Sequence, residues 1–257
     1  MRGVTRVELV LIGVLLVANF VSIRPLLQDV LDTSDDSQLN CAHELKVIAL
    51  ALHNYHDEHG SFPPARTIGA DGATHHSWRV LLLPHLGERP LYDQYRFEEP
   101  WDGENNRLLH HELPSDYPFH VCPLGDLEAA SKGRTSYLAV VGPHTAWRGE
   151  TAVSFDEVTD GIDQTILLVE VANSDVNWFE PRDLQWDEMS FRINDPDSLS
   201  PGSPHVQQYL VHADTPYVTV VMVDGHVKKL PVDTPPETLR ALLTIDGGES
   251  FDDPFLP

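Results

Sequence analysis

Histidine is the residue type in this chain that most readily suggests chemistry, because the sequence holds 14 of them. His53, His56 and His59 follow one another at three-residue steps, so in a helix each lies about one turn from the next. Two such side chains can bind one zinc ion if their ring nitrogens converge. The His-Glu-x-x-His motif is absent, so we favour the alternative that these histidines are hydrogen-bonded within a packed domain.

Nucleophile motifs are missing as well. The sequence contains neither a Gly-x-Ser-x-Gly elbow nor a glycine-rich loop that would hold phosphate. We therefore predict no catalytic residues and a protein that is not an enzyme. A metal-dependent hydrolase is the weakest alternative.

The sequence shows no cofactor-binding motif, and we expect no cofactor.

The two cysteines, Cys41 and Cys122, have a spacing that fits neither a zinc knuckle nor a thioredoxin-type pair. They form either one disulfide or two buried thiols. We favour the disulfide, because the orientation argued below places both in an oxidising compartment.

The elements that must position these residues begin with an amphipathic helix over about residues 37–59. Apolar residues recur there at the three-and-four spacing of one helical face: Ala42, Leu45, Ile48, Ala49, Leu52 and Tyr55. Gly60 ends the helix and Pro63-Pro64 prevents its continuation. Residues 32–60 are assigned to this helix and the acidic stretch before it.

The remainder, residues 61–257, is predicted to be mainly β. Two short helices are expected first, at Trp78–Leu86 and Pro90–Tyr95. Strands are expected later, as β-branched runs bounded by Gly, Pro or Asp: Ser136–Val141, Gln164–Val171 and Tyr217–Val223. The predicted fold class is therefore α+β, with an amphipathic helix packed on a mainly antiparallel sheet.

Asp224-Gly225 predicts a β-hairpin between Tyr217–Val223 and His226–Leu230. A two-residue turn at this point needs positive φ, which Asp and Gly tolerate best. Because turn geometry alone explains the pair, a catalytic role for Asp224 is the weaker alternative.

An apolar run from Leu9 to Ile23 lies near the start of the sequence. A cleaved signal peptide, a buried core helix and an uncleaved membrane anchor all fit such a run. No small-x-small cleavage site follows it, so we favour the anchor. Residues 1–31 are assigned to a leader and transmembrane helix.

The charges around this run predict an orientation. Arg2 and Arg6 precede it and acidic residues soon follow it, so the positive-inside bias predicts a single-pass protein of the cytoplasmic membrane. The N-terminus then lies in the cytoplasm and the C-terminal domain is extracytoplasmic. The formal net charge of −23 repels phosphate backbones, which excludes nucleic acid as a partner.

A series of motifs runs through most of the chain in order. It consists of Cys41-Ala42-His43-Glu44-Leu45-Lys46, Gly60-Ser61-Phe62-Pro63-Pro64, Ser77-Trp78-Arg79, Trp101-Asp102-Gly103 with Asn106, Cys122-Pro123, Tyr137 and Asp160-Gly161. Together these motifs resemble a large bacterial prepilin-like family, the domain-of-unknown-function 1559 family. That family usually closes with a histidine followed by Asp-Gly; here His212 precedes Asp224-Gly225 over a longer interval than usual.

The resemblance implies a type IV pilin leader. A prepilin peptidase would cut after Gly3 and leave Val4 as the first residue. Glu8 would be the acidic residue that meets a neighbour's terminal amine, a pairing favoured in lipid, where neither charge has water. The stretch Leu52–Pro64 is also similar to the pseudopilins of type II secretion, which implies a pilin-like fold.

Pseudopilins frequently hold calcium in an acidic loop, so the likeness implies calcium as the alternative to no cofactor, with Asp156, Asp160 and Asp163 as its oxygen ligands. Acidic loops are nevertheless common in a chain with 40 Asp and Glu residues.

We therefore expect a membrane-anchored envelope protein of pilin or pseudopilin type with an assembly or scaffolding role. Its expected partners are the membrane, further copies or other pilin-like subunits, and the peptidase. The alternative is a membrane-tethered monomeric binding protein that holds a ligand with the aromatic loops around Trp78, Trp101 and Trp147.

Overall fold

The computed structural model describes residues 42–69, 72, 75–112, 133–172, 174–202, 216–250 and 253–255. The chain divides into two units, Met1–Asn40 and Cys41–Pro257, and every described residue belongs to the second. No helix in the described part of the chain has the length and apolar character that a membrane span requires. Several residues singled out above lie outside the described residues, so the predictions about them stay predictions: Gly3, Val4, Glu8, Cys41, Cys122 and His212.

A long helix over residues 42–59 confirms the predicted amphipathic helix. Its inward face is 0–2 % exposed and consists of Leu45, Ile48, Ala49 and Leu52. The helix ends at Gly60, as predicted: the φ of Gly60 is +78°, and its N–H donates to the carbonyl of His56 at 2.7 Å.

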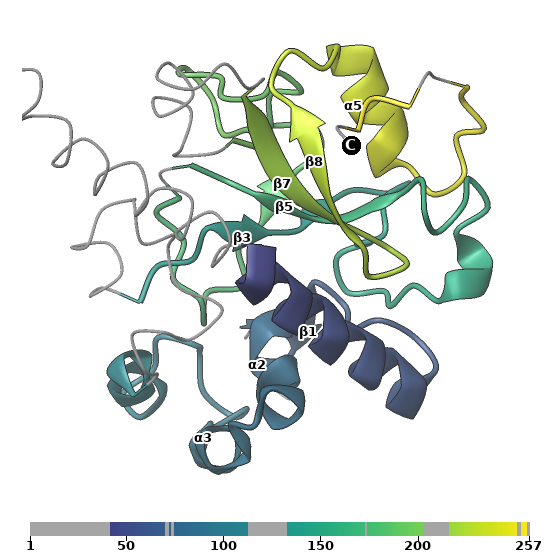
Figure 1. Cartoon of the computed structure of the whole chain (residues 1–257). Helices are drawn as coiled ribbons and strands as arrows, with labels where there is room; N and C mark the ends of the chain where they lie inside the picture. Colours follow the sequence, from purple (N-terminus) through teal and green to yellow (C-terminus); the bar gives the residue numbers. More distant parts are fainter. Residues whose placement is uncertain are drawn as a thin grey trace, which may run out of the picture. The chain divides into compact units, whose positions relative to one another are not determined.

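A four-stranded sheet with the strand order β3-β5-β7-β8 forms the centre of this unit (Figure 1). Its members are β3 (Tyr137–Leu138), β5 (Ile166–Glu170), β7 (Tyr217–Met222) and β8 (Val227–Pro231). All three pairings are antiparallel. Each strand falls within or beside a run predicted from the sequence, which confirms the α+β class.

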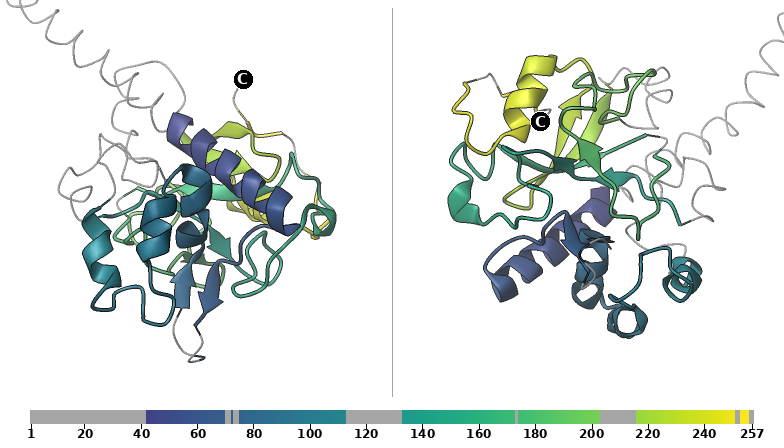
Figure 2. Two further views of the ribbon diagram at one scale, coloured as in Figure 1. Left: turned by 90° about the horizontal axis from the view of Figure 1, so that it is seen from below. Right: turned by 180° about the vertical axis from the view of Figure 1, so that it is seen from behind.

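Helices cover both faces of this sheet (Figures 1 and 2). The long helix packs on one face, where Leu168 and Val221 point into its core. Neighbouring residues along the same strands point to the opposite face, as strand geometry requires. There Val169 and Val220 pack in a second core with α5 (Pro236–Leu243).

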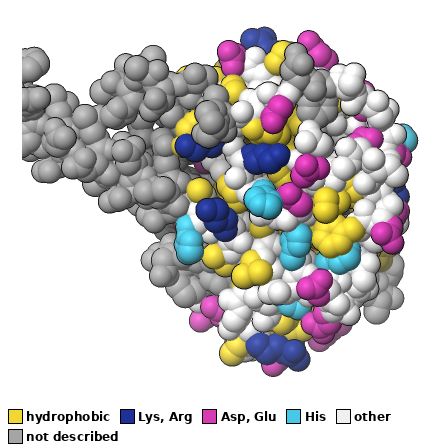
Figure 3. Space-filling view, turned by 45° about the vertical axis from the view of Figure 1, so that its right-hand side comes forward, with side chains coloured by type: hydrophobic (Ala, Val, Ile, Leu, Met, Phe, Trp, Pro, Cys, Tyr) yellow, Lys and Arg dark blue, Asp and Glu magenta, His cyan; other side chains and the backbone are white. Residues whose placement is uncertain are grey.

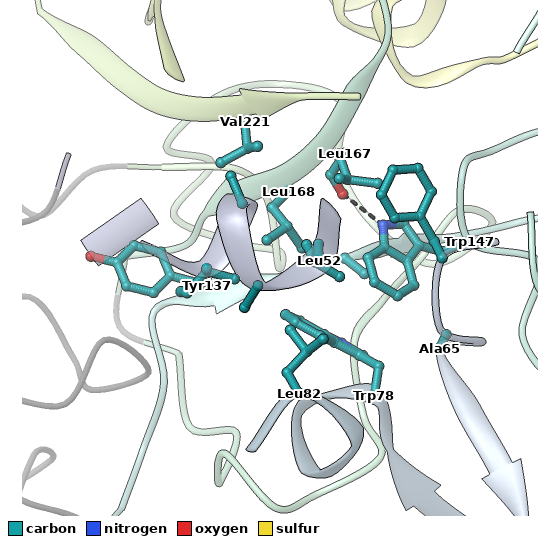
Figure 4. Close-up of a cluster of buried hydrophobic side chains, with 14 of the residues drawn as sticks. Leu52, Ala65, Trp78, Leu82, Tyr137, Trp147, Leu167, Leu168 and Val221 are labelled. Carbon is teal, nitrogen blue, oxygen red and sulfur yellow. Dashed lines mark hydrogen bonds between the residues drawn. The ribbon is translucent and has the colours of Figure 1, made fainter. Parts of the chain in front are cut away.

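Large aromatic side chains fill the core beneath the long helix (Figure 4). Trp78 and Trp147 are 0 % and 1 % exposed, with ring centroids 5.0 Å apart. The indole Nε1 of Trp147 donates to the carbonyl of Leu167 at 2.6 Å, so the polar end of this buried ring is satisfied.

Shorter elements surround the sheet and the long helix. They are β1 (Arg66–Ile68), β2 (His75–Ser77), α2 (Trp78–Leu82), η1 (Leu83–Leu86), α3 (Arg89–Gln94), η2 (Asn106–His111), β4 (Val140–Val141), η3 (Phe155–Glu157) and β6 (Leu184–Gln185). The segments α2, η1 and α3 confirm the two predicted short helices. The β4–β6 pair is parallel, an exception to the mainly antiparallel prediction.

The β7–β8 hairpin is confirmed, but the predicted two-residue turn is wrong. The N–H of Gly225 donates to the carbonyl of Met222, and the N–H of Met222 donates to the carbonyl of His226, both at 2.9 Å. These bonds enclose a three-residue loop of Val223, Asp224 and Gly225, in which Gly225 has a φ of +86°. Asp224 keeps negative φ, and its carboxylate accepts the backbone N–H of His226 at 2.9 Å.

Gly225 also lies directly against the long helix. A Cβ placed on it would be 3.0 Å from Nε2 of His53, and that nitrogen donates to the carbonyl of Val223 at 3.0 Å. Glycine is therefore required here both by the backbone conformation and by the approach of the imidazole.

Gly225→Ala should destabilise the protein more than Gly87→Ala does. Both glycines have a φ of +86°, but nothing lies within 4 Å of a Cβ placed on Gly87. We expect Gly87→Ala to cost about 1 kcal/mol for the left-handed conformation, and Gly225→Ala about 1–2 kcal/mol more, because His53 must move. Urea unfolding of the purified full chain measures both free energies; equal losses would contradict a restrictive contact with His53.

Candidate functional site

The three successive histidines of the long helix turn to three different partners. His53 Nε2 donates to the carbonyl of Val223 at 3.0 Å, since a carbonyl only accepts. His56 Nε2 accepts the backbone N–H of Phe155 at 3.4 Å. His59 Nδ1 donates to the carbonyl four residues before it at 2.9 Å. The three imidazoles are therefore hydrogen-bonded to separate groups. His53 and His56 are half-buried against the packed domain, whereas His59 is exposed and bonds within its own helix.

A different set of residues brings metal-binding atoms together. Within the described part of the chain, Glu58, His59 and His85 form a group whose ligand atoms all lie within 4.8 Å of one another. Burial lowers the pKa of His85, which favours the neutral imidazole that a metal requires. No sequence spacing connects His85 to the helix, because the fold alone brings η1 beside the helix end.

Two further histidines, His76 and His110, have structural contacts. His76 Nδ1 pairs with the hydroxyl of Tyr95 at 2.9 Å and Nε2 with the carbonyl of Phe97 at 3.1 Å. His110 Nε2 donates to the carbonyl of Trp101 at 3.1 Å, and the two rings stack. Both are held by the packing of the loops around them.

The predicted calcium ligands have separate contacts. The carboxylate of Asp160 accepts the N–H groups of Gly247 and Gly248 at 2.8 and 2.9 Å, which fixes the loop after α5. The main-chain carbonyl of Asp163 accepts from Nζ of Lys228 at 2.8 Å. Asp156 lies in η3. A calcium site at these residues stays a prediction.

An ion pair buried in the domain is the strongest polar feature of the interior. Nη2 of Arg79 lies 2.6 Å from Oδ1 of Asp183, with the two side chains 0 % and 2 % exposed. Burial lowers the pKa of Arg79 and raises that of Asp183, whereas each charge favours the ionised form of the other. Their short contact and the hydrogen bonds around them offset the cost of burying both charges.

Further hydrogen bonds join this pair to three parts of the fold. The carboxylate accepts the N–H of Ala139 at 2.9 Å and the indole N–H of Trp78 at 3.2 Å. The guanidinium donates to Oγ of Ser77 and to the carbonyl of Tyr137, both at 3.0 Å. The ion pair therefore connects α2, β3 and the segment before β6.

A second buried contact ties the same strand to the long helix. The hydroxyl of Tyr137 donates to Oε2 of Glu44 at 2.8 Å. Burial raises the pKa of Glu44 to about 7, and the hydrogen bond from Tyr137 partly offsets this rise. Burial, together with the charges of Glu44 and Glu170, raises the pKa of Tyr137 well above its usual value, so the phenol keeps its proton.

This buried polar network, defined by Glu44, Arg79, Tyr137 and Asp183, contains acid–base groups but offers them little access. Arg79, Tyr137 and Asp183 are buried, and Glu44 is half-buried against them. A substrate on the surface cannot reach the inner groups. We conclude that the network holds the domain together.

Two of the three tryptophans named for the binding alternative are unsuited to that role. Trp78 and Trp147 are 0 % and 1 % exposed in the core, so neither can contact a surface ligand. Trp101 is half-buried and stacks on His110 with a centroid distance of 5.3 Å. The expectation of an aromatic binding surface at Trp78 and Trp147 is therefore wrong.

A depression of about 290 Å³ lies elsewhere, beside the end of α5. Trp186 and Pro143 provide its apolar lining, and Asp246 and Glu249 add negative charge. His144 Nδ1 lies 3.0 Å from Oδ1 of Asp246 within this lining. No sequence motif indicates this depression, because its lining residues come from distant segments.

The fold and the network define an α+β domain in which a long helix is pinned to an antiparallel sheet by buried polar contacts. Residues 38–139 match the family model described as a protein of unknown function (DUF1559). This match confirms, for that part of the chain, the family resemblance predicted from the sequence. Glu44, Arg79 and Tyr137 all lie within it. No curated protein and no solved structure matches the chain.

Arg79→Met should destabilise the protein by about 3–5 kcal/mol, because it leaves the carboxylate of Asp183 buried without its partner. Combining it with Asp183→Leu removes both charges and should recover most of the loss. Urea unfolding of the single and double variants measures the coupling between the two sites. A double variant as unstable as the sum of the two single ones would show that the charges do not depend on each other.

Glu44 should make stability depend on pH near neutrality. Its pKa is about 7 in the folded protein and near 4.5 when exposed, so the folded state binds the extra proton between these values. The stabilisation is present below about pH 4.5 and is lost as the pH rises to about 7; because Glu44 is half-buried, it is on the order of 1–3 kcal/mol.

The measurement is the difference in unfolding free energy between the wild type and Glu44→Gln, followed from pH 4.5 to pH 8. As the pH rises, the unfolding free energy of the wild type should fall relative to that of Glu44→Gln. Glu104→Gln, at an exposed position, is the matched control and should give a flat difference. A flat difference for Glu44→Gln as well would contradict the raised pKa.

Proposed function

We propose that this protein is an envelope protein of the pilin type, anchored through residues 1–31 and without catalytic activity. Its extracytoplasmic domain would act in assembly or scaffolding. The observation that supports this proposal best is the long helix over residues 42–59, which packs its apolar face on an antiparallel sheet. This is the order of elements implied by the resemblance to pilins and pseudopilins.

The outward face of the long helix is the surface that we assign to contacts between copies. Leu50 lies on it and is 63 % exposed, unlike the buried leucines of the inward face. Lys46 and Asn54, one turn to either side of Leu50, are exposed as well. A neighbouring subunit could therefore reach this face without disturbing the core.

The second face of the sheet offers less room for such contacts. The helix α5 covers it, and Leu239, Leu242 and Leu243 are 0–1 % exposed there. Subunit contacts through the sheet would require α5 to move. The geometry therefore favours the long helix over the sheet as the assembly surface.

The distribution of charged groups also suits a non-enzymatic role. The ionisable side chains of the buried polar network are committed to one another. On the face drawn in Figure 3, acidic, basic and histidine side chains are interspersed with apolar ones. Such a mixed surface suits weak lateral contacts between subunits, with large single-charge fields absent from that view.

A membrane-tethered binding protein is the second candidate, and the depression at Trp186 is the observation that favours it. An indole beside Pro143, with Asp246 and Glu249 nearby, could bind a small cationic or amphipathic ligand. In this case the protein would act as a monomer, with the long helix serving only the fold.

A photo-reactive amino acid at position 50 should cross-link neighbouring copies in intact cells. Leu108 is the matched control, because it is 70 % exposed but lies on η2 instead of the long helix. We expect covalent dimers from position 50 and few or none from position 108, measured by immunoblotting of membrane fractions. In the same samples, mass spectrometry should find a mature chain that begins at a methylated Val4.

Two outcomes would argue against the pilin-type role. Equal cross-linking at positions 50 and 108 would indicate random contact in the membrane. An intact N-terminus at Met1 together with no cross-link at position 50 would leave the monomeric binding protein as the better description.

A further inference from the structure

The end of the long helix and the 3-10 segment η1 bring three metal-binding side chains together. Glu58 and His59 come from the last turn of the helix, and His85 comes from η1. One ligand atom from each lies within 4.8 Å of the other two. Nε2 of His85 is 3.9 Å from Oε2 of Glu58.

These distances are close to those of a bound ion. Ligand atoms about 2.0–2.1 Å from a tetrahedral zinc ion lie roughly 3.4 Å from one another. Glu58 is exposed and has a long side chain, so a change of its rotamers can bring its carboxylate closer to the two imidazoles.

Both imidazoles are held in place before any metal arrives. The ring of Tyr55 stacks on His59 with a centroid distance of 4.0 Å and meets His85 edge-on at 5.7 Å. Nδ1 of His59 donates to the carbonyl of Tyr55 at 2.9 Å, which leaves Nε2 as the unprotonated nitrogen of the neutral ring. A hydrogen bond of this kind commonly orients histidines that bind zinc.

A cation that could compete for Glu58 is already paired. Arg89 lies close enough to Glu58 to feel its charge, but its Nε donates to Oδ1 of Asp93 at 2.8 Å. The carboxylate of Glu58 therefore remains available to an ion, and its charge adds to the attraction of the two imidazoles.

We propose that Glu58, His59 and His85 bind one zinc ion and thereby clamp the end of the long helix to η1. Two imidazoles and one carboxylate suit zinc, whereas calcium and magnesium prefer ligand sets made of oxygen. The three ligands leave a coordination position open towards the solvent. This site is separate from Asp156, Asp160 and Asp163, and it does not depend on the pilin-type role.

The test uses the full chain, purified in detergent without a polyhistidine tag and stripped of metal. Titration with Zn²⁺ against a fluorescent chelator should give one equivalent per chain. Titration with Co²⁺ should give the intense visible absorption of a tetrahedral or five-coordinate site. His59→Gln and His85→Gln should each weaken Zn²⁺ binding at least about tenfold, since loss of even an outer partner of a zinc ligand does so.

His144→Gln is the matched control, because His144 is also exposed and lies 3.0 Å from a carboxylate oxygen of Asp246 but belongs to no three-residue group in the described residues. Its Zn²⁺ affinity should equal that of the wild type. His59 is exposed, so His59→Gln should keep the fold. It therefore tests the proposal even if His85→Gln fails to fold. The proposal is overturned by a wild type that binds less than one equivalent, by equal weakening in His144→Gln, or by displacement of zinc by excess Ca²⁺.

Discussion

The ion pair between Arg79 and Asp183 is the interaction on which the rest of this domain depends. Two opposite charges with almost no exposure are stable only while both are present, and hydrogen bonds to most of their other polar atoms reduce the cost of burial further; Nε of Arg79 is the exception among the described contacts of this pair. The partners of these atoms, Ser77, Trp78 and the backbone around Tyr137, come from α2 and β3. Any displacement of α2 against the sheet would separate the two charges. The ion pair therefore fixes the relative position of α2 and the sheet, which hydrophobic burial alone would leave less precisely defined.

Tyr137 links this arrangement to the long helix. Its carbonyl accepts from Arg79, while its hydroxyl donates to Glu44 on the helix. Apolar contacts such as those of Leu52 supply most of the attraction between helix and sheet, but they are non-directional. The two hydrogen bonds of Tyr137 are directional and therefore restrict how the helix can lie on the sheet. The residue that orients the helix is thus the same one whose carbonyl accepts a hydrogen bond from Arg79 of the ion pair.

Much of this fold can be predicted from the sequence because its elements carry strong local patterns. The helix over residues 42–59 follows from the spacing of its apolar side chains, and the strands β5 and β7 follow from apolar, β-branched runs bounded by Gly, Pro or Asp. The helix α5 was missed, although Pro236 at its start and the spacing of its leucines indicate it. The pairing of Arg79 with Asp183 and of His59 with His85 could not be predicted, since each joins segments that only the tertiary fold brings together.

The same distinction explains why the regular spacing of His53, His56 and His59 does not indicate which groups their ring nitrogens meet. Steps of three residues rotate successive side chains around a helix by less than a full turn. The ring nitrogens of the three histidines therefore meet different hydrogen-bond partners, although His53 and His56 both pack on Phe62 and Phe155. His53 bonds to the β7–β8 loop and His56 to η3, whereas the ring of His59 lies 6.3 Å from that of His85 in η1. The side chains of His53 and His56 therefore stabilise the fold. His59, at the end of the helix, is exposed and can take part in the proposed zinc site with His85 from another segment.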